Sequence, residues 1–389
     1  MLPQRLTSNP MKIERIDAWV CRFPLPAPFH PSWIPGVGEE HNSCVIYRVT
    51  TDDGVEGVAS GIAVLEEARA SLPLLRIYLT RRDVTAVEDL LKTLRSAHQI
   101  IGLRCFHVEL ALWDIIGKIA GLPVSKLLGG ARDSLPAYAS TGSLKEPAAH
   151  VEAVQQLRDL GFRAVKLRVR HPEPAQDVAV VEAVRSAVGD DYTLMVDANQ
   201  GWRVHGLAPY PEWDFKRALR FAQACDDLGV YWLEEPLYQH DYEGYATLRG
   251  STGVRIAGGE MLCELHPFRE MIQRGALDVV QPDATLSGGI LISRKVAVLA
   301  EAFGVEYAPH TWTNGIGLAA NLQCMGAAPN SSWCEYPFEP GSWVPEARDA
   351  MLTEPLRIGS DGTIAVPSAP GLGIEVDWEA VERHGVRLD

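Results

Sequence analysis

The sequence lacks several features that would place it quickly in a class of protein. Its seven cysteines are scattered and odd in number, and they include no C-x-x-C pair, which argues against a disulfide framework or a zinc cluster. No apolar run approaches ~18 residues, and no charged segment followed by an apolar one opens the chain. We therefore predict a cytoplasmic protein with buried free thiols and no membrane span.

Positive charge is also scarce. The chain carries 36 Lys and Arg against 50 Asp and Glu, a formal net charge of −14. This balance excludes a sequence-wide attraction to nucleic acid or to an anionic membrane. An anionic substrate would therefore need positive charge placed locally in its site. With 389 residues, 47% of them hydrophobic, the chain can bury a large core and is long enough for one large domain and a smaller one.

The first third of the chain predicts a small α+β domain. Strand-like segments lie at Lys12–Cys21, Ser43–Val49 and Glu56–Ala59. Between the first two is Pro24–Asn42, which is rich in proline, glycine and aromatic residues, and we predict that it is a loop covering a substrate; a plain surface loop is the alternative. Residues 62–130 have helical periodicity, most strongly at Cys105–Leu122.

From Leu135 the pattern changes to a short apolar strand followed by an amphipathic helix, repeated eight times over roughly 225 residues, the size of a (β/α)8 barrel. The strands are predicted at Leu135–Ser140, Ala164–Arg168, Thr193–Asp197, Val230–Glu234, Arg255–Gly259, Asp278–Asp283, Val305–His310 and Ser332–Glu335. The helices include Ala148–Leu160, Asp177–Val188, Asp214–Asp227 and Gly289–Phe303. An open doubly wound sheet is the alternative, because strand–helix alternation does not reveal whether a sheet closes.

These patterns divide the chain into three parts. We predict an N-terminal α+β capping domain over residues 11–134 and a modified TIM barrel over residues 135–363. A C-terminal segment, residues 364–389, is expected to return to the capping domain. Within that segment, Pro370–Asp377 is predicted to form a return strand outside the barrel.

Seven successive strands of the predicted barrel end in ionisable side chains. Catalytic groups of such barrels lie at the carboxyl ends of the strands, so a structural salt bridge or helix cap is a weaker explanation for the whole series than an active site. The strand-end residues are Lys166 and Arg168, Asp197, Glu234, Glu260, Asp283, His310 and Glu335.

Three carboxylates lie on consecutive strands, with no histidine or thiol among them: Asp197, Glu234 and Glu260. Converging carboxylates repel one another unless a cation lies between them. All-oxygen ligands favour a hard ion, and Mg²⁺ suits a site that leaves room for water or substrate oxygens, with Mn²⁺ as the alternative.

The remaining strand ends predict a proton-transfer site. Lys166 and Arg168 are two residues apart on a strand, so both point to one face. Asp283 and His310 end neighbouring strands and form a predicted carboxylate–histidine dyad, in which the acid fixes the imidazole tautomer. Cations on one side, a metal and a dyad opposite suit proton abstraction next to a carboxylate, with the enediolate held on the metal.

These motifs together resemble the enolase superfamily, in its mandelate racemase/muconate lactonizing branch, over nearly the whole chain. The matching segments are Ala111–Lys118 with Leu127–Gly130, Lys166-x-Arg168, Asp197–Gln200, Trp232–Pro236, Gly258–Glu260, Gln281–Asp283, His310 and Glu335. Each is weak by itself, but their order and spacing are specific.

The resemblance implies a role for each site residue. Asp197, Glu234 and Glu260 would bind Mg²⁺, Lys166 would help to neutralise the substrate carboxylate, Asp283–His310 would be the acid/base dyad, and Glu335 would donate a hydrogen bond to the substrate carboxylate. We expect Asn199, His30, Trp33 and Trp312 to contact the substrate, and Glu235 to support the metal ligands. The family also implies homo-oligomers.

One position departs from the family pattern. The racemases and lactonizing enzymes that this chain resembles carry a lysine base where Arg168 stands, and a guanidinium is a poor base. His310 is then the best-placed proton-transfer group, with Lys166 in reserve. Our hypothesis is a Mg²⁺-dependent acid-sugar dehydratase that converts an aldonate or aldarate to a 2-keto-3-deoxy acid. A racemase, epimerase or cycloisomerase on a similar carboxylate is the alternative.

Two interpretations from other classes compete with this hypothesis. Gly315-Ile-Gly317-Leu-Ala-Ala320 satisfies the loose G-x-G-x-x-[GA] pattern of a dinucleotide site, but it lies in the seventh repeat instead of opening a sheet. The second interpretation is a binding protein that has the same fold but no catalytic activity. It is disfavoured because chemically competent residues occupy every ionisable position of the predicted site.

Overall fold

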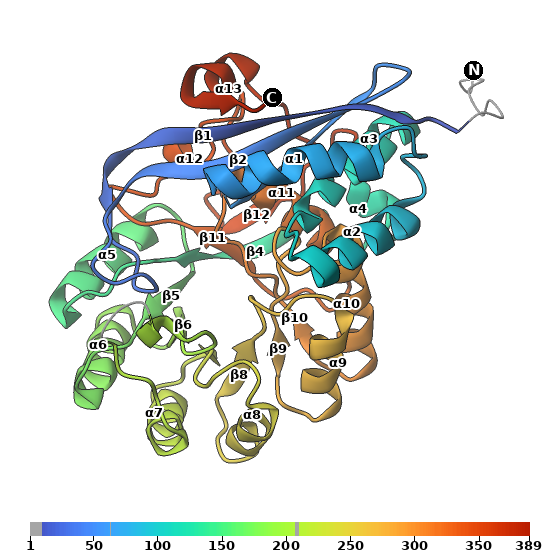
Figure 1. Ribbon diagram of the computed structural model, residues 1–389. Helices are drawn as coiled ribbons and strands as arrows, with labels where there is room; N and C mark the ends of the chain where they lie inside the picture. The colour runs from blue at the N-terminus through green and yellow to red at the C-terminus, as the bar shows by residue number, and fades with distance from the viewer. Residues whose placement is uncertain (1–9, 63, 207–209) are drawn as a thin grey trace.

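The computed structural model describes residues 10–62, 64–206 and 210–389, in which a barrel is covered by a separate sheet and its helices (Figure 1). The covering part, here called the cap, holds the sheet β13-β1-β2-β3. Its strands are β1 (Ile13–Phe29), β2 (Glu39–Thr51), β3 (Glu56–Ile62) and β13 (Gly385–Arg387). Its helices are α1 (Leu65–Leu79), α2 (Val87–Ile101), η1 (Phe106–Val108) and α3 (Glu109–Ala120), followed by α4 (Val124–Leu127).

The cap is held together around α3. Asp114 on this buried helix accepts hydrogen bonds from the amides of Val58 in β3 and Leu372 in the C-terminal segment, at 3.0 and 2.8 Å. Gly57 permits the contact, because a Cβ there would lie 2.2 Å from the Ala111 carbonyl oxygen. Helix, sheet and C-terminal segment therefore form one packed unit.

The barrel consists of eight parallel strands in the order β10-β9-β8-β7-β6-β5-β4-β11, and a bridge between Tyr307 and Ser331 joins its two ends. The strands are β4 (Ser134–Ser140), β5 (Ala164–Arg168), β6 (Thr193–Asp197), β7 (Trp232–Glu234), β8 (Arg255–Gly258), β9 (Val279–Val280), β10 (Glu306–Tyr307) and β11 (Cys334–Pro337). The predicted TIM barrel with an N-terminal cap is confirmed, and the open sheet is not.

Helices surround these strands, as Figure 1 shows for α5 to α10. They are α5 (Pro147–Asp159), α6 (Pro174–Val188), α7 (Phe215–Asp227), α8 (Tyr242–Arg249), α9 (Leu265–Gln273), α10 (Ile290–Ala302) and α11 (Gly315–Ala327), with the short η2 (Val204–Gly206) after β6. The remaining elements are α12 (Pro345–Arg348), β12 (Thr363–Ala365) and α13 (Trp378–His384). No helix among the described residues is long and apolar enough to cross a membrane.

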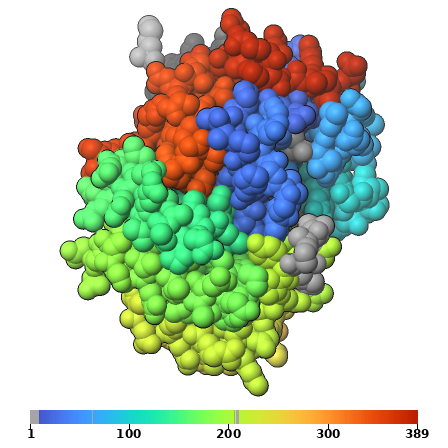
Figure 2. All heavy atoms as spheres, turned by 90° about the vertical axis from the view of Figure 1, so that its left-hand side faces the viewer, coloured from blue at the N-terminus to red at the C-terminus, as the bar shows by residue number. Residues whose placement is uncertain are grey.

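Two sequence predictions need correction. The covering loop is shorter than Pro24–Asn42, because β1 and β2 remain paired as far as Phe29↔Glu39, past an irregularity after Pro24. The connecting loop is therefore residues 30–38. The predicted strand Pro370–Asp377 is also wrong: it makes only isolated bridges, and the strand that pairs with β1 is β13 instead. Figure 2 shows the N-terminal part of the cap, in blue, lying against the green barrel segments and the orange C-terminal ones.

The barrel interior has a closed apolar layer beneath a polar one. Side chains alternate along a strand with period two, so a residue two positions beyond an inward-facing one faces inward as well. The lower layer holds Tyr138, Ala164, Met195, Trp232, Ala257, Val279 and Ala308. Two positions further along these strands are Ser140, Lys166, Asp197, Glu234, Gly259, Gln281 and His310. Strand geometry alone therefore gathers the polar groups at one end of the barrel, under the cap.

Candidate active site

Three buried carboxylates converge at the centre of the polar layer. Asp197, Glu234 and Glu260 each offer an oxygen, and these oxygens all lie within 4.8 Å of one another. Burial raises the pKa of Glu234 to about 8, and it also raises the pKa of Glu260. Carboxylates held this close in a dry environment need positive charge between or beside them.

Lys166 supplies part of that charge. Its Nζ lies 2.7 Å from Glu234 Oε1, 2.7 Å from Glu335 Oε1 and 3.6 Å from Asp197 Oδ2, and the side chain is fully buried. Burial by itself would lower the pKa of Lys166, but Glu234 and Glu335 outweigh it and raise the pKa above its usual value. The ammonium group therefore stays charged between Glu234 and Glu335.

Arg168 is held by a full set of hydrogen-bond acceptors. Its Nη1 contacts Asp197 and donates to Asn199 Oδ1 at 3.1 Å, and its Nε donates to the Thr141 carbonyl oxygen at 2.7 Å. Burial opposes the charge, but Asp197 outweighs it, so that the pKa of Arg168 is raised. A guanidinium held in this way is a poor proton acceptor, and its hydrogen bonds hold Asp197 and Asn199 in place.

His310 and Asp283 lie in contact on the side of the barrel opposite Lys166. His310 Nδ1 is 2.9 Å from Asp283 Oδ2, and Nε2 is 3.5 Å from Glu260 Oε2. Burial alone would lower the pKa of His310, but Glu260 and Glu335 outweigh it and raise the pKa to about 10. Asp283 is fixed in turn by Thr285 and by Asn321 Nδ2, the latter at 3.1 Å.

Both carboxylate oxygens of Glu335 accept hydrogen bonds from protein groups. Its Oε1 accepts a hydrogen bond from Ser140 Oγ at 2.7 Å, and its Oε2 accepts one from the Thr311 amide at 2.5 Å. Burial would raise the pKa of Glu335, but Lys166 and His310 lower it well below the usual range. In this arrangement Glu335 accepts two hydrogen bonds and pairs with the Lys166 ammonium group.

The loop of residues 30–38 reaches the barrel through two of its side chains. Ser32 Oγ donates to Asn199 Oδ1 at 3.3 Å, and the Arg168 guanidinium lies 5.0 Å from the centre of the Trp33 ring. Trp312, from the barrel, lies 5.5 Å from the same guanidinium and 4.9 Å from Trp33. Trp33 and Trp312 therefore lie at the site. His30 is exposed and lies against Gly38 in its own loop.

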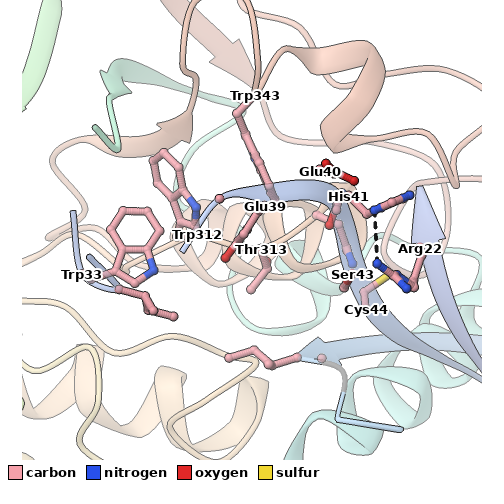
Figure 3. Close-up of a pocket in the computed structure, with 16 residues that line it drawn as sticks. Arg22, Trp33, Glu39, Glu40, His41, Ser43, Cys44, Trp312, Thr313 and Trp343 are labelled. Atoms are coloured by element: carbon pink, nitrogen blue, oxygen red, sulfur yellow. Dashed lines mark hydrogen bonds between the residues drawn. The ribbon is translucent and has the colours of Figure 1, made fainter. Parts of the chain in front are cut away.

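A cavity of about 420 Å³ lies beside these tryptophans and is called here the aromatic cavity (Figure 3). Trp33, Trp312 and Trp343 line one part of it, and Arg22 lies at the far end beside His41. Glu39 and Glu40 also line the cavity, so its cation is accompanied by two acids.

Several residues that complete the site were not predicted. Gln281 donates to Glu234 Oε2 at 2.8 Å, and Ser140 bonds Glu335. Both could have been found from strand period, because each stands two positions beyond an apolar inward residue, Val279 or Tyr138. Asn321 could not, since it lies within α11, a helix that is buried all round and shows no polar face.

Glu235 is buried beside the three carboxylates, with no hydrogen-bond partner on either oxygen among the described residues. Burial, then Glu260 and Asp197, raise its pKa well above the usual value. Its backbone has φ +45°, and Gly201 leaves room for it, because a Cβ there would lie 2.1 Å from Glu235 Oε1.

The donor set of the three carboxylates fits a hard divalent cation. Asp197, Glu234 and Glu260 offer only oxygen, they lie on three neighbouring strands, and they are buried where uncompensated negative charge is costly. Lys166 and Arg168 already contact Asp197, which limits the net charge that a cation would meet. These residues therefore fit Mg²⁺.

The glycine pattern at Gly315–Ala320 has a packing explanation. Asn314 caps α11 by accepting from the amides of Ile316 and Gly317. A Cβ on Gly317 would lie 2.0 Å from Thr313 Oγ1, and one on Gly315 would lie 2.5 Å from Leu352. The glycines allow a buried helix to pack, and nothing in this arrangement favours a dinucleotide.

Comparison with known proteins agrees with the geometry. Residues 149–381 match the family model described as "Enolase C-terminal domain-like", and residues 18–129 match the mandelate racemase/muconate lactonizing enzyme N-terminal domain. The chain belongs to the enolase superfamily, in its mandelate racemase/muconate lactonizing enzyme-like branch.

Its relatives carry out more than one reaction. The chain is 30% identical to D-galactarolactone cycloisomerase of Agrobacterium fabrum over 95% of this chain and 98% of that one. It is 35% identical to L-talarate/galactarate dehydratase of Salmonella typhimurium, over 70% and 63%, and 30% identical to D-galactonate dehydratase of Xanthomonas euvesicatoria, over 86% and 89%. Among solved structures, D-glucarate dehydratase from Agrobacterium tumefaciens complexed with magnesium has a TM-score of 0.84 and 27% identity, covering 97% of this chain and all of that one.

Proposed function

We propose that this protein is a Mg²⁺-dependent acid-sugar dehydratase, which removes the proton next to a carboxylate and eliminates the β-hydroxyl group. One observation carries the proposal: His310 is hydrogen-bonded to Asp283, whereas Arg168, at the position of the family's lysine base, is held by Thr141, Asn199 and Asp197. A site with one proton-transfer side chain suits elimination better than two-base racemisation. Relatives named as sugar-acid dehydratases support the same class.

The proposed metal ligands are Asp197, Glu234 and Glu260. When bound, Mg²⁺ supplies the positive charge that offsets these carboxylates and stabilises the negative charge developing on the substrate. A solved relative contains magnesium, which supports this choice. Mn²⁺ is the alternative, because it accepts the same oxygen ligands.

Lys166 and Asn199 are the proposed binding groups for the substrate carboxylate. Lys166 is paired with Glu234 and Glu335 in the free protein, so an incoming carboxylate would replace one of these partners. Because Glu335 is held ionised there, we propose that it orients Lys166, in place of the hydrogen-bond donor role implied by the family.

His310 is proposed to act twice. In the free protein Glu260 helps to keep His310 protonated, so we propose that neutralisation of Glu260 by a bound cation frees the imidazole of its proton. The neutral imidazole then takes the α-proton as the C–H bond breaks, and the electron pair moves toward the carboxylate. The same imidazolium then gives that proton to the departing β-hydroxide, so that water leaves. The resulting enol tautomerises to a 2-keto-3-deoxy acid. Asp283 holds the ring in place throughout, through Nδ1.

A cycloisomerase is the second candidate, and it is favoured by one observation. A cycloisomerase matches the chain over nearly its whole length, whereas the match to the talarate/galactarate dehydratase covers 70% of it. Such an enzyme would use the same proton abstraction but would give a rearranged product of unchanged mass. Mass spectrometry of the product therefore separates it from dehydration, which loses one water.

The test is to incubate the protein with Mg²⁺ and a library of acid sugars, and to measure 2-keto acid formation by the wild type and by His310→Asn. Asparagine keeps a polar group but cannot transfer the proton, so we expect kcat to fall by at least about 100-fold. His266→Asn, at an exposed histidine at the start of α9, should have no effect. A His310→Asn variant that dehydrates at near wild-type rate would overturn the assignment.

Sequence-based expectations of a cytoplasmic location and a homo-oligomer stay predictions. Cell fractionation tests the first, and size-exclusion chromatography with light scattering tests the second.

A further inference from the structure

Asp283 and His310 of the proposed dyad lie on two loops that are past the end of strand pairing. The ladder between β9 and β10 continues only to Ala308, whose amide donates to the Val280 carbonyl oxygen at 3.1 Å. Beyond this point, within the described part of the chain, the direct hydrogen bond between the two loops is the one inside the dyad itself. Strand pairing alone therefore does not determine how Asp283 and His310 lie relative to each other.

The side chain of Asn321, on α11, bonds both loops at once. Its Oδ1 accepts from the Ala284 amide at 3.0 Å. Its Nδ2 lies 3.1 Å from Asp283 Oδ1, 3.0 Å from the His310 carbonyl oxygen and 3.2 Å from Thr311 Oγ1. A backbone amide can only donate, so the atom that faces Ala284 is the side-chain oxygen, and the nitrogen faces the dyad. One side chain therefore contacts both members of the proton-transfer pair.

The other hydrogen bonds to the Asp283 carboxylate are local. Thr285 donates to Oδ1 through its amide at 2.7 Å and its hydroxyl at 2.8 Å, and it is only two residues away on the same loop. These bonds orient the carboxylate within its own loop. Asn321 is 38 residues from Asp283 and 11 from His310, on a helix that is buried along its length. A packed helix holds a polar group more precisely than a loop does, so Asn321 can fix one loop relative to the other.

We propose that Asn321 is a positioning residue for the proton transfer, because its bonds to both loops set the distance and direction between Asp283 and His310. This inference rests on the proposed function, which assigns the proton transfer to His310. With Nδ2 in place, Asp283 Oδ1 accepts three hydrogen bonds, and Oδ2 is left for the imidazole Nδ1 at 2.9 Å. Without Nδ2 the two loops can shift independently, and a misplacement of about 1 Å can lower a rate by about 100-fold.

A second buried amide on the same helix provides a matched control. Gln323 Oε1 accepts from the Ser125 amide at 2.7 Å, and its Nε2 donates to the carbonyl oxygens of Pro367 and Leu372 at 2.8 and 3.1 Å. Like Asn321, Gln323 is fully buried and bonded through both ends of its amide, but its partners lie in α4 and in the C-terminal segment. The two residues therefore contribute to packing in a similar way, and only Asn321 contacts the dyad.

The first experiment measures kcat and KM with Mg²⁺ and the acid sugar that the wild type dehydrates fastest. Asn321→Ala should lower kcat by at least about tenfold and change KM by less than about twofold, because the proton-transfer pair loses its alignment while the carboxylate-binding groups stay in place. Gln323→Ala should keep kcat within about twofold of the wild type, although both variants should lose thermal stability. A wild-type kcat in folded Asn321→Ala, or an equal loss of kcat in Gln323→Ala, would overturn the proposal.

A second variant covers the case in which Asn321→Ala does not fold. Asn321→Leu fills the same space with a side chain of similar shape, but it offers neither the donor nor the acceptor. Its kcat should fall as much as that of Asn321→Ala. Circular dichroism shows whether each protein is folded, and a folded Asn321→Leu protein with wild-type kcat would refute the positioning role.

The imidazole of His310 gives a readout that does not require turnover. In protein with isotope-labelled histidine, the ring N–H that donates to Asp283 should give a proton NMR signal at low field, identified by its absence in His310→Asn. We expect this signal to move to higher field, or to be lost by exchange with water, in Asn321→Leu. The signal should stay unchanged in Gln323→Ala. An unchanged signal in Asn321→Leu would contradict the proposal.

Failure of the proposed function gives a different result. If no acid sugar yields a 2-keto acid, dehydration is wrong, but the NMR comparison still tests Asn321. A His310 signal that changes in Asn321→Leu and not in Gln323→Ala then supports the positioning of the dyad by Asn321. Identical signals in both variants overturn it.

Discussion

Individual buried residues decide which chemistry this site allows. Arg168 differs from lysine by a planar, permanently charged head that forms several hydrogen bonds at once, and here they go to Thr141, Asn199 and Asp197. The substitution therefore replaces a group that could exchange protons with one that orients its neighbours. His310 remains as the imidazole in contact with a carboxylate at the barrel mouth.

Another buried residue, His150 on α5, should control stability at acid pH. Neither of its ring nitrogens has a partner among the described residues, and burial, with Lys145 nearby, lowers its pKa to about 3. Because the unfolded chain takes up the proton near pH 6.5 and the folded chain does not, this histidine reduces the free energy of unfolding as pH falls below 6.5. The loss should reach about 2 kcal/mol at pH 5.

Urea unfolding of the wild type and His150→Leu at pH 7 and pH 5 measures this contribution. The variant should lose about 2 kcal/mol less than the wild type between the two pH values. Gln156→Leu, at an exposed site on the same helix, should keep the wild-type pH dependence. Identical pH dependence in all three proteins would refute the assignment to His150.

At the scale of elements, one helix joins the barrel to the cap. Helix α11 is buried along its length, and its capping residue Asn314 also donates from Nδ2 to Ser60 Oγ of β3 at 2.7 Å. Asn314 therefore satisfies amides at the N-terminus of α11 and forms a hydrogen bond to the sheet of the cap with the same side chain. The segment from Trp312 to Asn314 leads into the helix and lines the aromatic cavity, so the position of α11 also sets one side of that cavity.

Asn314→Ala should thus cost more than the loss of an ordinary helix cap. We expect the free energy of unfolding, measured in urea, to fall by about 2 kcal/mol. About 1 kcal/mol of this comes from losing the N-terminal cap of α11 and a similar amount from losing the hydrogen bond to Ser60. Asp214→Ala is the matched control, because Asp214 caps α7 by accepting from the Arg217 amide at 2.7 Å, and it should cost only about 1 kcal/mol. Equal losses of unfolding free energy in both variants would show that the hydrogen bond from Asn314 to Ser60 contributes nothing to stability.

At the scale of the whole molecule, folding and metal binding should be linked. The three proposed ligands come from three strands whose alignment requires the closed barrel, so the unfolded chain has no such site. A ligand that binds only the folded state stabilises it by about 2.7 kcal/mol at 100 times its dissociation constant.

Thermal unfolding with Mg²⁺ and with EDTA tests this linkage. The melting temperature of the wild type should rise with Mg²⁺ concentration, and Glu260→Gln should abolish most of the rise by removing one anionic ligand. Glu301→Gln, at an exposed position on α10, should respond as the wild type does. A melting temperature that does not depend on Mg²⁺ would refute the proposed metal site.

Local patterns predicted the elements that are regular in their own neighbourhood. β5 and β6 have the predicted bounds, because Ala164–Arg168 and Thr193–Asp197 are buried runs that end at a change of chemistry. β9 and β10 are only two residues long, because the polar residues that follow them turn away from strand pairing and lie in the site. The covering loop was predicted too long, because prolines near Pro24 indicate a loop locally, whereas pairing with β2 keeps the segment extended as far as Phe29.

The sequence by itself determined the chemical groups: three carboxylates on consecutive strands, a histidine after an aspartate on the next two, and an arginine where a lysine base would be. The period of a strand and the order of the repeats bring these groups to one end of a barrel, so they can be predicted without coordinates. Only the tertiary structure decided how they are paired, with Lys166 between Glu234 and Glu335. These contacts join residues that are 68 or more positions apart in the chain, and local patterns carry no information about them.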